Sequence, residues 1–164
     1  MSEVEVDATM TTLFSDLASE AEHSVPEDIH GLFEQALTVM LNARDMEMSE
    51  IEDGPLGEPS FAARFRSLLD LEAWLDAAMM LAPVSERKGP GYHGGFGGNY
   101  WAIHIETLGY DDGVYQKGRA ACVIHHPLSS GGGPLVKAFH PFVGVAVLIA
   151  TLKAHAKWTE LWKG

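Results

Sequence analysis

The chain has 164 residues, of which 46% are apolar and 21% are charged, so it can bury a core and is not disordered throughout. Its single cysteine, Cys122, excludes an internal disulfide, and the acidic first ten residues lack the basic and apolar regions of a signal peptide. We therefore expect a cytoplasmic protein, and no stretch of the sequence reaches transmembrane length.

Charge is distributed unevenly along the chain. Residues 1–60 carry fifteen acidic residues and one basic residue, a net charge of −14, whereas residues 61–164 have a net charge of +2. An acidic surface of this density repels nucleic acid and steers basic proteins toward it. The distribution predicts a protein partner with a basic surface and no direct contact with nucleic acid.

Two amphipathic helices are predicted in the acidic segment. The first has apolar residues at helical spacing: Leu13, Phe14, Leu17, Ala18 and Ala21. The S-x-x-E pattern from Ser24 to Glu27, with Pro26 in the first turn, predicts the start of a second helix that ends near Ala43. The apolar stripe of this second helix comprises Ile29, Leu32, Phe33, Ala36, Leu37 and Met40.

A linker is predicted from Asp45 to Pro59, where the sequence is acidic and carries two glycines and two prolines. It divides the chain into an acidic helical segment, residues 1–58, and an α+β core domain, residues 59–164. In the core domain, residues 61–81 predict a helix that is broken near Ser67, where S-L-L-D would cap a new start. The glycine-rich stretch after it, residues 89–98, predicts a loop.

The remaining sequence predicts two strands and a buried helix. Residues 100–107 alternate as in a half-buried strand, and residues 115–126 would pair with them after a turn at 109–113. From His140 to Lys157 a helix would be apolar nearly all round, which is typical of a buried helix, and its apolar run is too short to span a bilayer. We therefore predict an α+β protein with N-terminal acidic helices and an antiparallel hairpin or small sheet, which edge pairing or a homodimer would complete.

Four consecutive motifs resemble the phage ABA-sandwich domain of small phage and prophage proteins. They are the helix LEAWLDAAMMLAP, the strand NYWAIHIET, the strand GRAACVIHH and the helix HPFVGVAVLIATLKAH. The resemblance covers residues 67–156 and leaves the acidic segment outside it. It implies a phage origin and an α-β-α sandwich, and it supplies no catalytic residue and no activity.

Two glycine-rich stretches are candidates for phosphate-binding loops. Residues 89–94 form a G-x-G-x-x-G pattern, but a helix precedes it and a strand follows it, which is the reverse of the dinucleotide-binding order. Residues 129–133 lie before a helix but lack the G-K-[ST] ending of a P-loop, so anion binding there is a weaker interpretation than a connecting loop. We therefore predict no cofactor.

Histidine is the one enriched reactive residue type. Five histidines lie within 48 positions, with Cys122 among them: His93, His104, His125, His126 and His140. If the hairpin forms, His104 meets His125 or His126 on one sheet face, where a metal or general-base site becomes feasible. No H-E-x-x-H or C-x-x-C motif supports such a site. Ser129 and Ser130 lie near His125 in the sequence, but without a G-x-S-x-G motif they do not indicate a serine hydrolase. We therefore assign no catalytic and no metal-binding residue.

The acidic segment has three interpretations: a solvated face, a helical pair that binds a partner, or a phosphate mimic that occupies the basic groove of a nucleic-acid-binding protein. Our leading hypothesis is a non-enzymatic phage or mobile-element protein that inhibits a host protein in the cytoplasm, in its sharper form an anti-defence inhibitor such as an anti-CRISPR. The carboxylates expected to face the partner are Glu20, Glu22, Glu27, Asp28, Glu34, Asp45, Glu47, Glu50, Glu52 and Asp53. The alternatives are a small metal- or histidine-dependent enzyme and a phage structural or assembly protein.

Overall fold

The computed structural model describes residues 2–43, 60–83, 101–106, 109–111, 114–116, 118–127, 134–159 and 161. Its helices are α1 (Glu3–Glu22), the short 3-10 helix η1 (Pro26–Asp28), α2 (Ile29–Ala43), α4 (Phe61–Asp70), α5 (Trp74–Leu81) and α6 (Val143–Lys157). Its strands are β1 (Ala102–Glu106), β2 (Gly109–Asp111), β3 (Val114–Gln116), β4 (Ala120–His125) and β5 (Leu135–His140). The predicted α+β class, N-terminal helices and small antiparallel sheet are confirmed.

The main sheet has the strand order β1-β4-β5, and both neighbouring pairs are antiparallel. Val123 of β4 lies opposite His104 of β1 on one side and Lys137 of β5 on the other, so these three residues share one sheet face. The predicted pairing of residues 100–107 with a later strand is therefore correct. That later strand begins at Ala120, because β3 pairs with β2 in a separate hairpin between β1 and β4.

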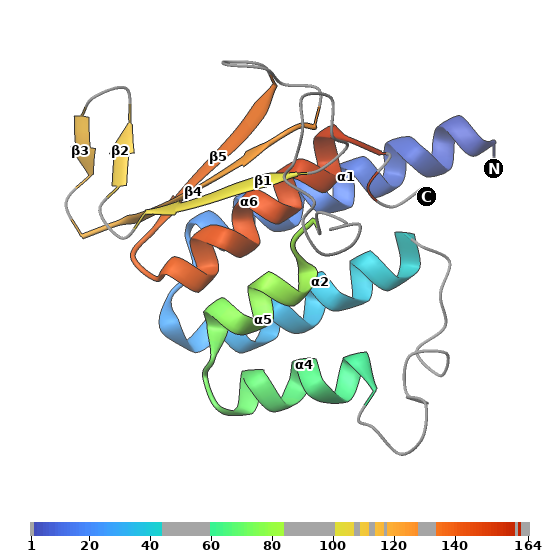
Figure 1. Ribbon diagram of the computed structural model, residues 1–164. Helices are drawn as coiled ribbons and strands as arrows, with labels where there is room; N and C mark the ends of the chain where they lie inside the picture. Colours follow the sequence, from blue (N-terminus) through green and yellow to red (C-terminus); the bar gives the residue numbers. More distant parts are fainter. Residues whose placement is uncertain are drawn as a thin grey trace, which may run out of the picture.

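Helix α6 is the centre of the molecule. It lies against the sheet, with α1 along one side of it and α5 on the other (Figure 1). Eleven of its residues, from Gly144 to His155, are buried, which confirms the helix predicted to be apolar all round. Because every face of α6 packs against another element, this helix joins the N-terminal helices and the sheet into one hydrophobic core.

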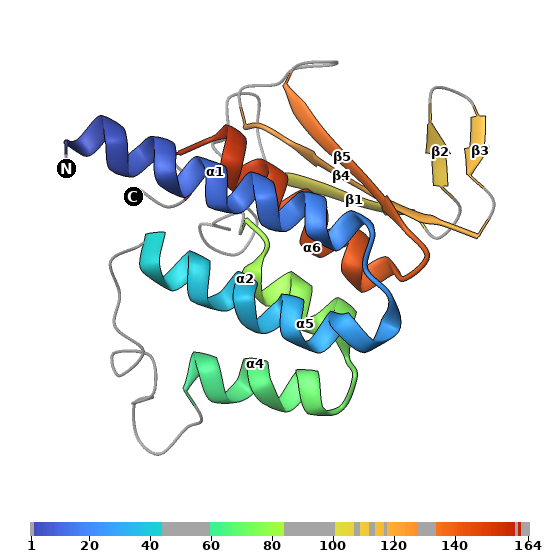
Figure 2. The same ribbon diagram turned by 180° about the vertical axis from the view of Figure 1, so that it is seen from behind.

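All the described helices lie on one face of the sheet (Figures 1 and 2). The residues of β4 and β5 that face α6 are buried, among them Cys122, Ile124 and Ala138. The opposite face, which we call the outer face, carries His104, Val123, His125 and Lys137. A helical layer on the outer face, which an α-β-α sandwich would add, is not among the described residues.

Helix α1 packs on α6, and α2 packs mainly on α1, through the apolar residues that the sequence predicts, except that Leu13 of α1 is 41% exposed. Phe14, Leu17, Ala18 and Ala21 of α1 are buried, and so is the whole predicted stripe of α2. The predicted linker, residues 45–59, lies outside the described residues, so the division of the chain at residue 58 stays a prediction. Docking by these faces leaves most acidic residues of α1 exposed: Glu3, Glu5, Asp16 and Glu20.

The predicted capping box at Ser24 is wrong. The Ser24 hydroxyl donates instead to the carbonyl of Ala21 at the end of α1, at 2.7 Å, and Val25 precedes η1 with no side-chain cap. The capping box of the structure lies at the start of α1, where Ser2 and Glu5 exchange hydrogen bonds between side chain and backbone.

Two other boundaries differ from the prediction. The break in residues 61–81 falls after Asp70, because the Ser67 hydroxyl bonds to the Ala63 carbonyl within α4 and does not cap a new helix. Residues 135–140 form strand β5, so His140 ends a strand and α6 begins at Val143. The predicted helix start at His140 was therefore three residues too early.

Candidate functional site

The structure separates the predicted partner-binding carboxylates into two groups. Glu20, Glu27 and Asp28 are exposed. Glu22 is held by Lys153 of α6, with 2.7 Å between Oε1 and Nζ, and Glu34 lies 3.4 Å from Nε of Arg66. The other five predicted residues lie outside the described residues: Asp45, Glu47, Glu50, Glu52 and Asp53.

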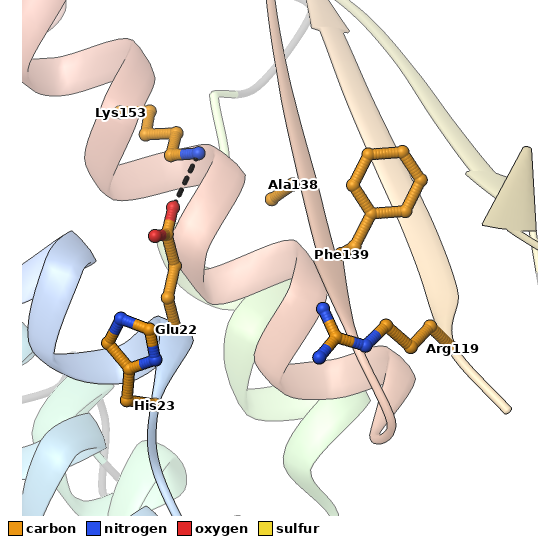
Figure 3. A pocket seen from close by; sticks show the side chains of 6 residues that line it. All are labelled: Glu22, His23, Arg119, Ala138, Phe139 and Lys153. Atoms are coloured by element: carbon orange, nitrogen blue, oxygen red, sulfur yellow. Dashed lines mark ion pairs between the residues drawn. The ribbon is translucent and has the colours of Figure 1, made fainter. Parts of the chain in front are cut away.

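Glu22 lies at the edge of a small polar hollow of about 230 Å³ between α1, α6 and β5 (Figure 3). The Lys153 ammonium that binds Glu22 also donates to the Lys137 carbonyl at 3.1 Å, so it ties α1 to β5. The Arg119 side chain extends from the start of β4 toward the same hollow. Because its charge is balanced within the fold, Glu22 is a poor candidate for partner binding.

Three chain connections meet at one end of the molecule. Ser24, between α1 and α2, contacts His140 at the end of β5: its hydroxyl lies 3.2 Å from Nε2 of His140. The connection from α4 to α5 reaches α2, because Nε2 of His30 lies 3.9 Å from Oδ1 of Asp70. Trp74, at the start of α5, packs directly against the backbone at Gly144 near the start of α6. These contacts bring together exposed residues that are far apart in the sequence.

We call this surface the acidic end. Its exposed carboxylates and large apolar residues are Val25, Glu27, Asp28, Asp70, Leu71, Glu72, Leu75, Asp76 and Phe142; the exposed His30 and Arg119 border it, beside Asp70 and His140 respectively. Five of these nine residues are carboxylates, and the other four are large apolar side chains. Leu71 is 77% exposed, Val25 49% and Phe142 41%. Exposed apolar residues that are surrounded by charged ones are typical of protein interaction surfaces.

Glu72 occupies an unusual backbone position in the acidic end. Its φ angle is +56°, in the left-handed region that glycine adopts most easily. The backbone N–H of Ala73 donates to the Leu68 carbonyl at 2.8 Å and that of Glu72 to the Leu69 carbonyl at 3.0 Å, which is the Schellman pattern at the end of α4. A glutamate at the glycine position of this motif costs about 1 kcal/mol. The strained residue is one of the exposed carboxylates of the acidic end.

Of the five histidines that the sequence singles out, four lie in the part of the chain that the structure describes, and they occupy three environments: the outer face, an aromatic cluster and the end of β5. His104 and His125 lie together on the outer face, with ring centres 5.1 Å apart, as the sequence predicts for a hairpin. His126 contacts Trp101 and Trp158, with 5.2 Å between ring centres in each pair, so it belongs to an aromatic cluster. Cys122 is buried on the opposite face of β4, where burial raises the pKa of its thiol to about 12. It therefore takes no part with the histidines of the outer face.

His140 has a structural role that the sequence did not predict. Its Nδ1 accepts the backbone N–H of Phe142 at 3.0 Å, so Nε2 carries the proton of the neutral ring and faces Ser24. The side chain is 2% exposed, and burial lowers its pKa. The ring therefore fastens the end of α1 to the start of α6.

The glycine-rich stretches, His93, Ser129 and Ser130 lie outside the described residues. Among the described histidine, cysteine and acidic residues, no group of three is placed to bind a metal ion. None of the described helices is long and apolar enough to cross a membrane. No family model, no curated protein and no solved structure matches this chain. The resemblance to the phage ABA-sandwich domain therefore stays a prediction.

Proposed function

We propose that this chain is a non-enzymatic binding protein whose acidic end docks on a basic surface of a partner protein. In the form that we favour, it is a phage or mobile-element inhibitor, and the basic surface is one that its host target uses to bind nucleic acid. The observation that carries the proposal is the combination of five exposed carboxylates with four exposed apolar side chains at one end of the molecule.

The acidic end has both properties that a protein interface needs. Its apolar residues supply area that loses contact with water when a partner binds, and charged residues around them steer a basic partner and orient it. A surface that only kept the protein soluble would not require Leu71 to be 77% exposed in the same place. The charges would act mainly on the rate of association, so binding is expected to weaken as the salt concentration rises.

The position of Glu72 also supports an interaction surface. Glycine at this position would remove backbone strain, yet the residue present carries a carboxylate into the acidic end. A strained residue that gives no stability to the fold is explained if its side chain contacts a partner.

The experiment is an affinity purification of the tagged protein from host lysate, with and without nuclease, followed by mass spectrometry. We expect one nucleic-acid-binding protein or effector complex to remain enriched after nuclease treatment. Binding of the purified target is then measured at low and high salt by surface plasmon resonance. The variants are Glu27→Lys and Leu71→Ser in the acidic end, with Glu106→Lys as the matched charge reversal on the outer face.

We expect Glu27→Lys to slow association roughly tenfold and to reduce the salt dependence, because one attractive contact becomes repulsive. Leu71→Ser should speed dissociation, since it removes an apolar contact. Glu106→Lys should behave like the wild type. Equal effects of Glu27→Lys and Glu106→Lys would show that net charge matters and the acidic end does not.

Glu72→Gly separates binding from folding. It removes a carboxylate and relieves backbone strain, so the variant should be as stable as the wild type or more stable, by up to about 1 kcal/mol, while its affinity falls. Unchanged affinity in a stabilised protein would remove Glu72 from the interface.

A further inference from the structure

The outer face of the sheet carries a second group of residues that the acidic end does not use. His104 lies opposite Val123 in the register, and His125 follows two residues later in β4, so the two histidines are diagonal neighbours on the same face. Their ring centres are 5.1 Å apart and their planes are inclined at 77°. His104 is exposed and His125 is partly exposed, so solvent reaches the pair.

This separation fits two imidazoles that share one metal ion. A zinc–nitrogen bond is about 2.1 Å long, and an imidazole ring centre lies about 1.1 Å behind its nitrogen. Two such rings on a tetrahedral ion therefore have centres about 5.2 Å apart. Planes that are far from parallel are also compatible with two neighbouring ligand positions on one ion.

The strands hold this geometry in place. In the antiparallel register, His104 and Val123 form a ladder pair, as do Ala102 and His125, so both histidines belong to regular strand backbone. Side chains on paired strands are positioned more precisely than those on loops. Regular strand backbone therefore fixes the Cβ positions of both histidines.

We propose that His104 and His125 form a two-histidine site for a divalent transition-metal ion of the class that imidazole prefers, such as zinc, cobalt or nickel. The protein supplies two ligands, so the remaining positions on the ion are left for water. The site is separate from the acidic end and does not depend on the proposed function.

The test is isothermal titration of untagged protein with zinc chloride and with cobalt chloride at pH 7.5. The variants are His104→Gln and His125→Gln, which keep a polar side chain of similar size, and the control is His30→Gln on the exposed surface of α2. We expect one ion per chain for the wild type and for the control, and binding weaker by roughly tenfold or more in each of the other variants. Cobalt absorption and ring nitrogen chemical shifts should identify the same two residues.

Three results would overturn the proposal. They are no zinc or cobalt binding by the wild type at millimolar metal, binding that is unchanged in both variants, and binding that only one of the two variants loses. Circular dichroism of each variant checks that the fold is retained. In the first case the two rings would simply be in edge-to-face contact.

Discussion

Replacement of Gly144 by alanine should destabilise the protein, because the start of α6 packs backbone to backbone on the start of α5. A Cβ atom at Gly144 would lie 2.5 Å from the backbone nitrogen of Leu75, 2.5 Å from the carbonyl carbon of Trp74 and 2.6 Å from the Trp74 Cβ. Nonbonded carbon atoms prefer separations of about 3.5–4.0 Å, so the two helices would have to move apart by about 1 Å.

The cost follows from the position of α6. A shift of this helix disturbs its contacts with the sheet and α1 as well as with α5, and overpacking of this kind typically costs about 1–3 kcal/mol. Alanine has the higher helix propensity, which offsets up to about 1 kcal/mol of that cost in a helix interior and less near a helix start. We therefore expect Gly144→Ala to lower the free energy of unfolding by about 1–3 kcal/mol.

Gly31 in α2 provides the matched control. A Cβ atom there would meet nothing within 4 Å, so Gly31→Ala, in the first turn of α2, should raise the free energy of unfolding by up to about 0.5–1 kcal/mol through helix propensity alone. Urea unfolding followed by circular dichroism measures both variants at the same temperature and pH. If Gly144→Ala is as stable as the wild type, or is stabilised like Gly31→Ala, the close approach of α5 and α6 is wrong.

Three further predictions concern buried or paired side chains. Cys122, with its thiol pKa raised to about 12 by burial, should not react with iodoacetamide at pH 8 in the native protein and should react once guanidinium unfolds it; rapid native labelling would contradict this. Burial lowers the pKa of His140 in the folded state, so below about pH 6.5 the unfolded chain binds more protons than the folded one and the free energy of unfolding should fall as the pH drops. The urea midpoint of the His140→Gln variant should depend less on pH in this range than that of the wild type. Lys153→Met should lower the free energy of unfolding by at most about 1 kcal/mol, because both side chains of the pair with Glu22 are about one-third exposed. Thermal unfolding measures this, and a loss of several kcal/mol would show that Lys153 supports the fold in another way.

The helices were predictable where apolar spacing is regular. The apolar stripe of α2 predicts one wide buried face, and the continuous apolar run of α6 predicts burial on nearly all sides. The structure shows both. The boundaries were less accurate, because side chains such as Ser24 and Ser67 have more than one hydrogen-bonding option. Each bonds to a carbonyl of the preceding turn and does not cap the helix that follows.

Strand β5 was missed because its alternation has little contrast. Val136 and Ala138 face the core, while Leu135 and Phe139 lie on the outer face and are also apolar. A period of two is clear only when one face is polar, and here only Lys137 marks the outer face. The glycine-rich stretch before the strand and the long apolar run after it made these six residues look like part of a connection.

The acidic end could not be predicted from the distribution of charge along the sequence. Dividing the chain by net charge assigned the acidic surface to residues 1–60, but the fold pairs Glu34 with Arg66 and Glu22 with Lys153. Three of the five carboxylates of the acidic end come from residues 70–76, in the part of the chain with a net positive charge. The charge that a partner meets is thus set by which carboxylates are held by lysine or arginine within the fold and by where the chain connections converge, and both depend on tertiary contacts. The sequence suggests Glu27 and Glu34 alike for charge reversal, but reversing Glu34 would break its ion pair with Arg66, whereas Glu27 is exposed and is the residue that the structure favours.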